Sequence, residues 1–444
     1  MAWRRLGSGP PAVLAAIGAA LLASTAWGTA VQTAFGPVAF AALAIGQGLL
    51  VLLALRIALR CEARRALALI AIVAVGLRLL LLPIEPNLSS DAYRYVWDGR
   101  VQSAGINPYR HVPRDPALEA LRDEAIHPHI NRADYAVTIY PPAAQMLFLA
   151  VNQVADGLLA MKLAFILCEV LTVAVLLDLL RRLSQPPVRV LAYAWHPLAV
   201  WEVAGNAHID AAMVGMMMLG LWVALVPGRR LLATAILAVA ALVKPPAALL
   251  LSLVWRAWDW RAPAVAITVA ALLYLPYLSV GTGVIGFLPE YLGEERIAAG
   301  DGFWLVAVLQ HLFGPIPWAR PLYLAGVALL IGTLALAVAL GRDTSMEARL
   351  RRLFWLLFAS VALLSPDYPW YWLIVLPFVV LLGPPPAWAA TIGAFVFYAI
   401  HGDDPAFSLL LRESALYLAI IATLLLVLRT HRAAPALAAG DLTR

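Results

Sequence analysis

Long apolar runs, separated by short polar linkers, recur along almost the whole chain. Many of them reach about 18 residues, which is long enough for a helix to cross the hydrocarbon core of a bilayer. Because the runs are continuous and do not alternate with polar residues, they favour helices over a β-barrel. The pattern therefore predicts an all-α fold, a polytopic transmembrane helical bundle with roughly 11–13 membrane segments.

A long polar interval, from about residue 85 to 138, follows the third apolar run. It begins with a segment, 89–100, that contains two aspartates, two arginines, two tyrosines and a tryptophan. We expect this segment to form an amphipathic helix at a membrane surface, capped by Ser89 or Ser90 and ended by Gly105. If the protein has an enzymatic activity, we expect the reaction to take place here.

The composition agrees with a membrane protein and excludes an ordinary soluble domain. Of the 444 residues, 63% are hydrophobic and only 13% are charged, against about 25% charged residues in soluble domains. The net charge of +6 comes largely from arginines in short linkers, where such residues set topology; no nucleic-acid partner is expected. The two cysteines, Cys61 and Cys168, offer neither a disulfide framework nor a metal site.

The basic linkers indicate a topology if all of them lie in the cytoplasm. The chain then reaches the outer face just before residue 85, so that 85–138 is an outer loop within one integral membrane domain, 1–444. Both termini are expected to be cytoplasmic, with a short basic tail at 429–444, and the plasma (inner) membrane is the expected location. We interpret the first apolar run as an uncleaved helix rather than a signal peptide, because many spans follow it. The first three expected spans are about 11–30, 37–58 and 66–84.

Some later segments are not simple spans. The runs at about 141–156 and 158–180 cannot both cross the membrane if the arginines that follow them are inside. The run 231–255 carries Lys244-Pro245-Pro246 in its middle, which predicts two half-helices that meet at a break. A hairpin of about 190–204 and 209–227 is expected to place 205–210 at its outer tip. The remaining expected spans are about 262–280, 321–341, 353–365, 369–383, 386–400 and 407–428.

This topology rests on arginines, yet it places other ionisable side chains together at the outer boundary. Ionisable residues at membrane depth are functional candidates, and a polar pocket between helices is where a ligand would bind. The alternative is that outer loops simply hold polar residues. The residues that converge are Asp91, Asp98, His208, Asp210, Asp301, Asp367, Asp403 and Asp404.

Asp91 and Asp98 share one helix face and are the candidate catalytic residues, because a carboxylate facing the pocket can act as general base toward a hydroxyl. The alternatives are that Asp91 complements the helix dipole and that Asp98 pairs with Arg94. Nearby cations can hold a phosphate, and Lys244 is expected to be buried and unpaired until an anion binds it. The candidate residues for binding a donor phosphate are Arg94, Arg100, Lys244 and Arg296.

Further residues at the same boundary are candidates for substrate binding. Each of them also has an alternative, purely structural interpretation. The aromatic residues can belong to an interfacial belt, Asn107 can form a plain turn, and His208 and Asp210 can cap a hairpin. The candidates are Tyr95, Trp97, Asn107, Tyr109, Tyr140, His208, Asp210, Trp370 and Tyr371.

The polar interval carries two linked motifs, Asp91-x-x-Arg94-Tyr95-x-Trp97-Asp98-Gly99-Arg100 and Gly105-Ile106-Asn107-Pro108-Tyr109. Together they resemble the first large outer loop of the GT-C superfamily of polytopic glycosyltransferases. The likeness is closest to the bacterial polyprenyl-phosphate-mannose-dependent mannosyltransferases and covers about residues 85 to 380. Weaker similarities follow in matching order at Ile139-Tyr140-Pro141-Pro142, Asn206-Ala207-His208-Ile209-Asp210, Lys244-Pro245 and Pro369-Trp370-Tyr371.

The resemblance implies an enzyme that moves a sugar, with mannose as the first expectation, from a polyprenyl-phosphate donor in the outer leaflet to a glycan, lipid or protein acceptor. It also implies inversion of the anomeric centre, with Asp91 as base and Asp98 as the substitute. One departure is that this acid follows the third span, whereas superfamily members commonly carry it after the first span and often as paired acids. Whether the enzyme needs a divalent metal is therefore left open. No metal ligand is assigned and no cofactor is predicted.

Other functions also fit many spans and buried charge. A polytopic transporter or flippase of lipid-linked or polar substrates is the main alternative, although the inverted repeats expected of many transporters are not visible. A lipid-linked assembly factor is disfavoured because its large outer loop normally comes late in the chain. A non-catalytic scaffold would have no use for a polar outer pocket.

Overall fold

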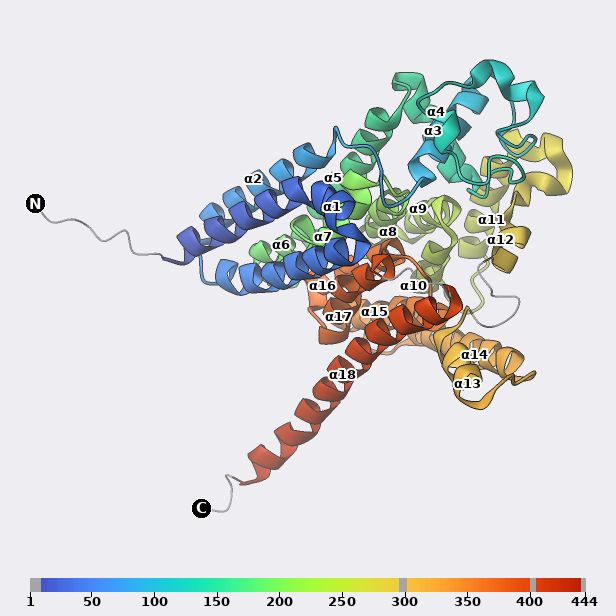
Figure 1. Ribbon diagram of the computed structural model, residues 1–444. Helices are drawn as coiled ribbons and strands as arrows, with labels where there is room; N and C mark the ends of the chain where they lie inside the picture. Colours follow the sequence, from blue (N-terminus) through green and yellow to red (C-terminus); the bar gives the residue numbers. More distant parts are fainter. Residues whose placement is uncertain (1–8, 295–301, 400–404, 441–444) are drawn as a thin grey trace, which may run out of the picture.

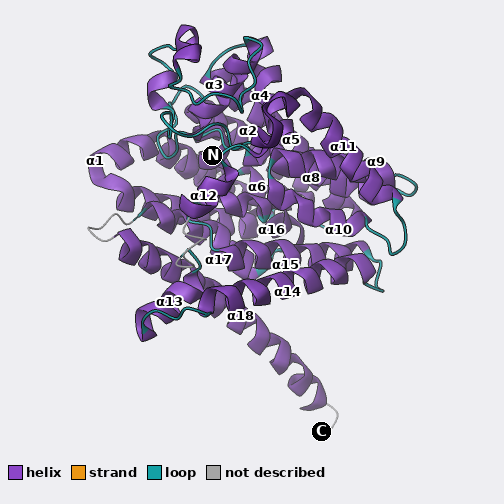
Figure 2. Cartoon of the chain, turned by 90° about the vertical axis from the view of Figure 1, so that its right-hand side faces the viewer, coloured by secondary structure: helices purple, strands orange, loops and turns teal. Residues whose placement is uncertain are grey.

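The computed structural model describes residues 9–294, 302–399 and 405–440. Every regular element in these three stretches is helical, and none of them is a strand; Figure 2 shows helices joined by loops. Several of the helices are long and apolar. The predicted class, an all-α polytopic membrane protein, is therefore confirmed.

The N-terminal region contains the first three predicted spans. α1 (Pro10–Ala58) is interrupted at Gly36, whose φ is 81°, and Pro37 follows it. A positive φ suits glycine and proline cannot donate a helical hydrogen bond, so the break divides this helix of 49 residues into two. α2 (Ala63–Leu81) follows and packs against α1 (Figure 1).

Five helices of the described residues are long and apolar enough to cross a membrane, or six if a bent pair counts as one span. This number is lower than the 11–13 segments expected, because α1 counts once and because short helices buried inside the protein also produce apolar runs. The five are α1, α5 (Leu158–Arg182), the stretch Arg261–Glu294, α14 (Ala319–Leu340) and the part Phe407–Arg429 of α18.

Two predicted irregularities are present. α4 (Pro142–Val154) has only 13 residues, too few for a bilayer that needs about 20, so α4 and α5 are indeed not both full spans. α9 (Arg230–Val243) ends at Lys244, whose backbone is extended with φ −152° and ψ 126°. The chain continues as η5 (Pro245–Leu250) and α10 (Leu251–Val254). The predicted break at Lys244 is therefore confirmed.

The hairpin expected around 205–210 is instead a sharply bent helix pair. Its two parts, Pro197–Gly205 and α8 (Asp210–Ala224), are bent by 119° at the four residues between them. The first part ends in a π-helical turn, η4 (Val200–Gly205). Such turns are rare and occur frequently at functional sites.

α3 (Asp91–Ser103) has the predicted ends but not the predicted surroundings. The N–H of Asp91 donates to Oγ of Ser89 at 3.2 Å, and Gly105, with φ 76°, follows the last turn. All eight residues 92–99 are buried. The expectation of an amphipathic helix at a membrane surface is therefore wrong, because α4 and the segment 104–141, hereafter the α3–α4 loop, cover the helix.

The loop region and the chain ends lie on opposite sides of the bundle. In Figure 1, α3, α4 and α12 (Leu288–Glu294) lie at the right. The ends of α1 and α18 next to the chain termini point to the left and lower left. The α3–α4 loop is thus far from both of these helix ends.

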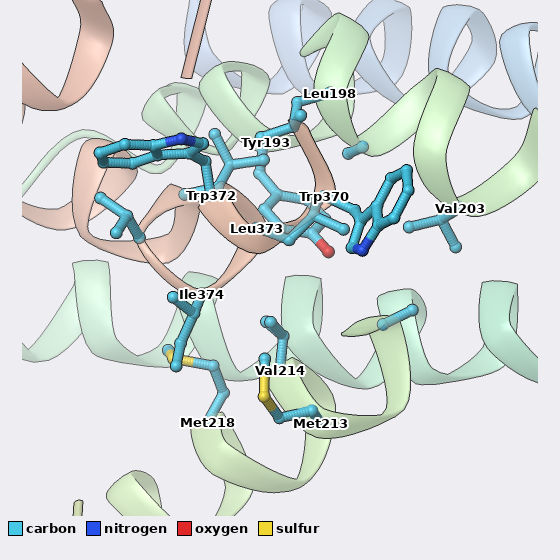
Figure 3. Close-up of a cluster of buried hydrophobic side chains, with 14 of the residues drawn as sticks. Tyr193, Leu198, Val203, Met213, Val214, Met218, Trp370, Trp372, Leu373 and Ile374 are labelled. Atoms are coloured by element: carbon cyan, nitrogen blue, oxygen red, sulfur yellow. The ribbon is translucent and has the colours of Figure 1, made fainter. Parts of the chain in front are cut away.

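An apolar core lies where α8 meets η7 (Pro369–Ile374). In Figure 3, Leu373 and Ile374 lie between Met213 and Met218 of α8 on one side and Tyr193 on the other. All five side chains are buried. This packing fixes η7, which carries two of the predicted substrate-binding residues.

Shorter or peripheral helices complete the described chain. They are η1 (Pro116–Leu121), η2 (His127–His129), η3 (Pro187–Val190), α6 (Leu191–Ala194), α7 (Pro197–Ala199), α11 (Arg261–Tyr274), η6 (Leu275–Ile285), α13 (Trp304–Phe313), α15 (Met346–Leu364), α16 (Leu376–Leu382), α17 (Pro385–Gly393), η8 (Ala394–Tyr398) and α18 (Pro405–Gly440).

Candidate active site

A cavity of about 490 Å³ opens between the start of α3, the α3–α4 loop, the break at Lys244, α12 and η7. Its wall combines charged groups with aromatic and apolar side chains, as ligand pockets do. The polar and aromatic lining residues are Ser89, Ser90, Asp91, Arg94, Tyr95, Asn131, Arg132, Tyr140, Lys244, Phe287, Tyr291, Tyr368, Trp370 and Tyr371.

Asp91, the first residue of α3, is an acid that faces this cavity. Its side chain is 24% exposed, and Nδ2 of Asn131 donates to its Oδ1 at 3.4 Å. Burial raises the pKa of the Asp91 carboxyl above its usual range, and the positive charge of Lys244 opposes this rise. A carboxylate with a raised pKa holds a proton more readily, which suits a general base.

Asp98 lies outside the cavity, although it belongs to the same helix and motif. Its carboxylate accepts hydrogen bonds from Nε of Arg94 at 2.8 Å, Oγ1 of Thr138 at 2.6 Å and Nε2 of Gln145 at 2.8 Å. The residue is 1% exposed. The structure thus places Asp98 in the ion pair that the sequence offered as the alternative, away from the cavity that Asp91 faces.

Lys244 faces the cavity from the helix break, but it is not unpaired as expected. Its Nζ lies 2.7 and 2.8 Å from the two carboxylate oxygens of Asp210 and 4.2 Å from the centre of the Tyr371 ring. Asp210 does not line the cavity; it is the counter-ion of Lys244. Ion pairing, instead of a bound anion, offsets the cost of burying this lysine.

The predicted arginines differ in their positions. Arg94 lines the cavity, but it is bound to Asp98 and, through Nη1 at 3.1 Å, to the carbonyl oxygen of Ala136. Arg100 lies away from the cavity in ion pairs with Asp123 at 2.7 Å and Asp156 at 2.8 Å. The structure therefore does not bring Arg100 to the site. Arg296, Asp301, Asp403 and Asp404 lie outside the described residues.

Arg132 is a cavity residue that the sequence did not identify. Its backbone has φ 53°, in the left-handed region, and such conformations cluster at binding sites when the surrounding structure enforces them. Its Nε donates to Oε2 of Glu294 at 2.6 Å, and its guanidinium lies 5.6 Å from the centre of the Tyr291 ring. The contact between the α3–α4 loop and α12 creates this position, so no local pattern marks it in the sequence.

Four of the predicted aromatic residues, Tyr95, Tyr140, Trp370 and Tyr371, line the cavity. The rings of Tyr95 and Tyr140 meet edge to face with centroids 4.9 Å apart. Trp370 stacks on Tyr368 at 4.4 Å. Stacked rings of this kind present flat apolar faces, which suits a sugar ring as well as a lipid chain.

Three other predicted substrate-binding residues do not line the cavity. Trp97 packs on His127 with ring centroids 5.3 Å apart. Nδ2 of Asn107 donates to the carbonyl oxygen of Tyr277 at 2.9 Å, and the hydroxyl of Tyr109 donates to the carbonyl oxygen of Tyr140 at 2.6 Å. Of the three, Tyr109 thus binds a residue of the cavity wall, Tyr140.

His208 and the unpredicted Glu202 lie behind Asp91, and neither lines the cavity. Nδ1 of His208 is 3.9 Å from Oδ2 of Asp91, and its Nε2 is 3.3 Å from Oε2 of Glu202. A charged residue inside the apolar run around 200 was the signal that could have identified Glu202. Among the described residues, no three His, Cys, Asp or Glu side chains are grouped so that they could hold a metal ion.

A model of a known protein family matches the chain. The N-terminal domain of the family described as alpha-(1->6)-mannopyranosyltransferase matches residues 6–262, more than half of the chain. The matched stretch includes α3, the bent pair and the break at Lys244. No protein of curated function and no solved structure matches the chain. The chain therefore belongs to the alpha-(1->6)-mannopyranosyltransferase family, and it is a glycosyltransferase of the mannosyl-transferring class.

Proposed function

We propose that this enzyme transfers mannose from a polyprenyl-phosphate donor to an acceptor hydroxyl, with inversion, and that Asp91 is the general base. The observation that carries the proposal is that the carboxylate of Asp91 and the ammonium group of Lys244 face one cavity. An acid that takes a proton and a cation that holds a phosphate are the two groups that such a transfer needs.

The proposed reaction is a single displacement. The acceptor hydroxyl gives its proton to Asp91 while its oxygen forms a bond to the anomeric carbon of the mannose. The bond between that carbon and the phosphate oxygen breaks on the opposite face, and the phosphate leaves with the electron pair. A phosphate leaves without protonation, so this scheme has no general acid, and attack opposite the leaving group inverts the configuration.

The cations of the cavity suit a donor phosphate. Lys244 donates to Asp210 and has three N–H groups in all, which allows it to hold a phosphate oxygen as well. Arg132 lies on the wall formed by the α3–α4 loop and can approach the phosphate from a second direction. Neutralising the leaving group with preorganised cations stabilises the transition state.

An isoprenoid chain fits the surroundings of these cations. Val243, Pro245, Phe287 and Leu288 contribute an apolar part of the cavity wall. Phe287 and Leu288 belong to the stretch Arg261–Glu294. In the most apolar 18 residues of this stretch, only 6% of the residues are buried inside the protein. A lipid tail can therefore pass from the cavity along this stretch into the bilayer while its phosphate stays at the polar end.

The site is proposed to face the outer side of the plasma membrane, with both termini in the cytoplasm, because basic linkers favour the cytoplasm. Acceptors of this class carry a free hydroxyl and include glycans, lipids and proteins. A reporter that is active only outside the cytoplasm, fused near Arg114, is expected to be active. An inactive reporter there would contradict this orientation.

The function is tested with purified protein in lipid and radiolabelled polyprenyl-phosphate mannose, glucose and arabinose, with and without a chelator. We expect label to leave the mannose donor, and Asp91→Asn to prevent this. Asp134→Asn, which changes an exposed acid of the α3–α4 loop that does not line the cavity, is the matched control and should retain activity. Absence of turnover and of binding for all three donors would overturn the proposed donor class.

A further inference from the structure

Behind Asp91 the structure places a row of three ionisable side chains, which we call the Asp91–His208–Glu202 row. The side chains of His208 and Glu202 are 0% exposed. The imidazole lies between two carboxyl groups, 3.9 Å from Asp91 on one side and 3.3 Å from Glu202 on the other. The row therefore leads from the cavity into the interior of the bundle.

The bent helix pair holds this row in place. The N–H of Leu88 donates to Oδ1 of Asn206 at 3.0 Å, and Nδ2 of Asn206 donates to the carbonyl oxygen of Trp201 at 2.9 Å. The segment just before α3 is thereby tied to the bend that carries His208. The Trp370 ring stacks on the imidazole with centroids 3.9 Å apart. These contacts keep the imidazole directed at Asp91.

Both ring nitrogens of His208 are buried without a hydrogen-bond partner of ordinary geometry among the described residues. Buried polar atoms are nearly always satisfied, so these two nitrogens need an explanation. Hydrogen bonds between catalytic groups are frequently long in the free enzyme and tighten when substrate binds. The distance from Nδ1 to Asp91 exceeds an ordinary hydrogen bond by about 1 Å, which is a small adjustment.

We propose that His208 and Glu202 are positioning residues for the mannosyl transfer proposed above: they orient Asp91 and share the proton that it takes from the acceptor. This inference rests on the proposed function. It gives His208 a different part from the substrate contact that the sequence predicted.

The number of protons in the row explains how His208 and Glu202 help Asp91 to take up the acceptor proton. A neutral imidazole has one N–H donor and one bare nitrogen, so it can bond to two carboxyls only if one of them is protonated. If both carboxyls are ionised, the ring instead carries a positive charge. Either arrangement has a net charge of −1 and accepts one more proton. The row can thus take the acceptor proton without leaving an isolated buried charge, which would be costly.

One hydroxyl and three charged groups act on the row from neighbouring elements. The hydroxyl of Tyr398 lies 3.1 Å from both carboxylate oxygens of Glu202. Lys244, Arg132 and Asp210 act electrostatically on the base. All four of these neighbours stay unchanged in the variants below, so a changed pH profile reports on the row itself.

The test is the pH dependence of mannosyl transfer by the full-length protein in lipid, with radiolabelled polyprenyl-phosphate mannose. His208→Phe keeps an aromatic ring against Trp370 and removes both nitrogens. We expect kcat to fall about 10- to 100-fold with an unchanged donor KM. The acidic limb of the profile should move to higher pH, because the ionised base loses a hydrogen-bond donor. Glu202→Gln keeps the shape of the side chain and is expected to lower kcat about tenfold.

His196→Phe is the matched control. His196 is also fully buried in the same part of the chain, but it lies beside Trp388, accepts from the N–H of Leu198 at 3.2 Å and does not line the cavity. We expect this variant to retain the kcat and the pH profile of the wild-type enzyme. If the replacement of any buried histidine lowered kcat, His196→Phe would lower it as well.

Wild-type kcat and pH profile in both row variants would overturn the inference and leave the mannosyl transfer intact. If one variant does not fold, as judged by its Tm, the other variant decides. If the wild-type protein transfers no mannose, the proposed function fails, and an infrared pH titration tests the row without turnover. The carboxyl band that Asp91→Asn removes must then change its midpoint in Glu202→Gln; an unchanged midpoint overturns proton sharing.

Discussion

The two aspartates of α3 differ in every property that matters for catalysis. Asp91 has one long hydrogen bond, from Asn131 at 3.4 Å, and faces the cavity. Asp98, about two turns later, is buried and accepts three hydrogen bonds of 2.6–2.8 Å. Three of the roughly four acceptor sites of the Asp98 carboxylate are thus occupied, and the residue does not line the cavity. One motif thus contains an acid that faces the cavity and an acid that is enclosed in an ion pair.

The largest effect is expected at the first of these residues. Asp91→Asn should lower kcat about 10²- to 10⁴-fold, because the amide cannot take the acceptor proton. The Tm should stay the same or rise, since an uncharged amide is easier to bury than a carboxylate. Transfer assays and thermal unfolding of the same preparation measure both. Transfer at the wild-type level would show that Asp91 is not the base.

The second aspartate should show the reverse pattern. Asp98→Asn leaves the buried guanidinium of Arg94 without its counter-ion and should lower the free energy of unfolding by about 3–5 kcal/mol. The fraction that remains folded should retain its kcat. A stable but inactive Asp98→Asn variant would contradict this assignment and make Asp98 the candidate base.

A third variant separates stability from donor binding at Lys244. Lys244→Gln should raise the donor KM about 10- to 100-fold, since a hydrogen bond to a charged group contributes about 1.5–3 kcal/mol. It should also lower the Tm, because Asp210 loses its partner. Adding Asp210→Asn should restore the Tm but not the donor affinity. Recovery of both would show that Lys244 serves structure alone.

The smallest expected effect is the pH dependence of the wild-type enzyme. Burial raises the pKa of Asp91, and the base must be ionised to act. Activity should therefore be lost, as the pH falls, at a higher pH than for an exposed aspartate. The same shift means that ionised Asp91 does not stabilise the fold, which agrees with the Tm expected for Asp91→Asn. An acidic limb at the pH of an ordinary aspartate would contradict the raised pKa.

Much of the fold was predictable, because membrane segments are visible as runs of apolar residues and breaks as prolines. The interruption at Lys244 and the short α4 were inferred in this way, and both are present. The burial of α3 was not predictable: its polar residues indicate a surface helix when read alone. Asp98, for example, is bound inside the protein by Thr138 and Gln145, which lie 40 and 47 residues away along the chain.

By itself, the sequence determined the helical membrane class, the helix break and a list of candidate residues that contains Asp91 and Lys244 but not Arg132 or Glu202. Only the tertiary structure decided which of these residues face the cavity and which are paired. Lys244 meets Asp210 across 34 residues, and Asp91 meets Asn131 across 40. Hydropathy is a property of one segment, whereas ion pairing depends on contacts between distant segments. For that reason the residue pattern left both Asp91 and Asp98 as candidates, with Asp91 first by resemblance, and only the fold showed how their surroundings differ.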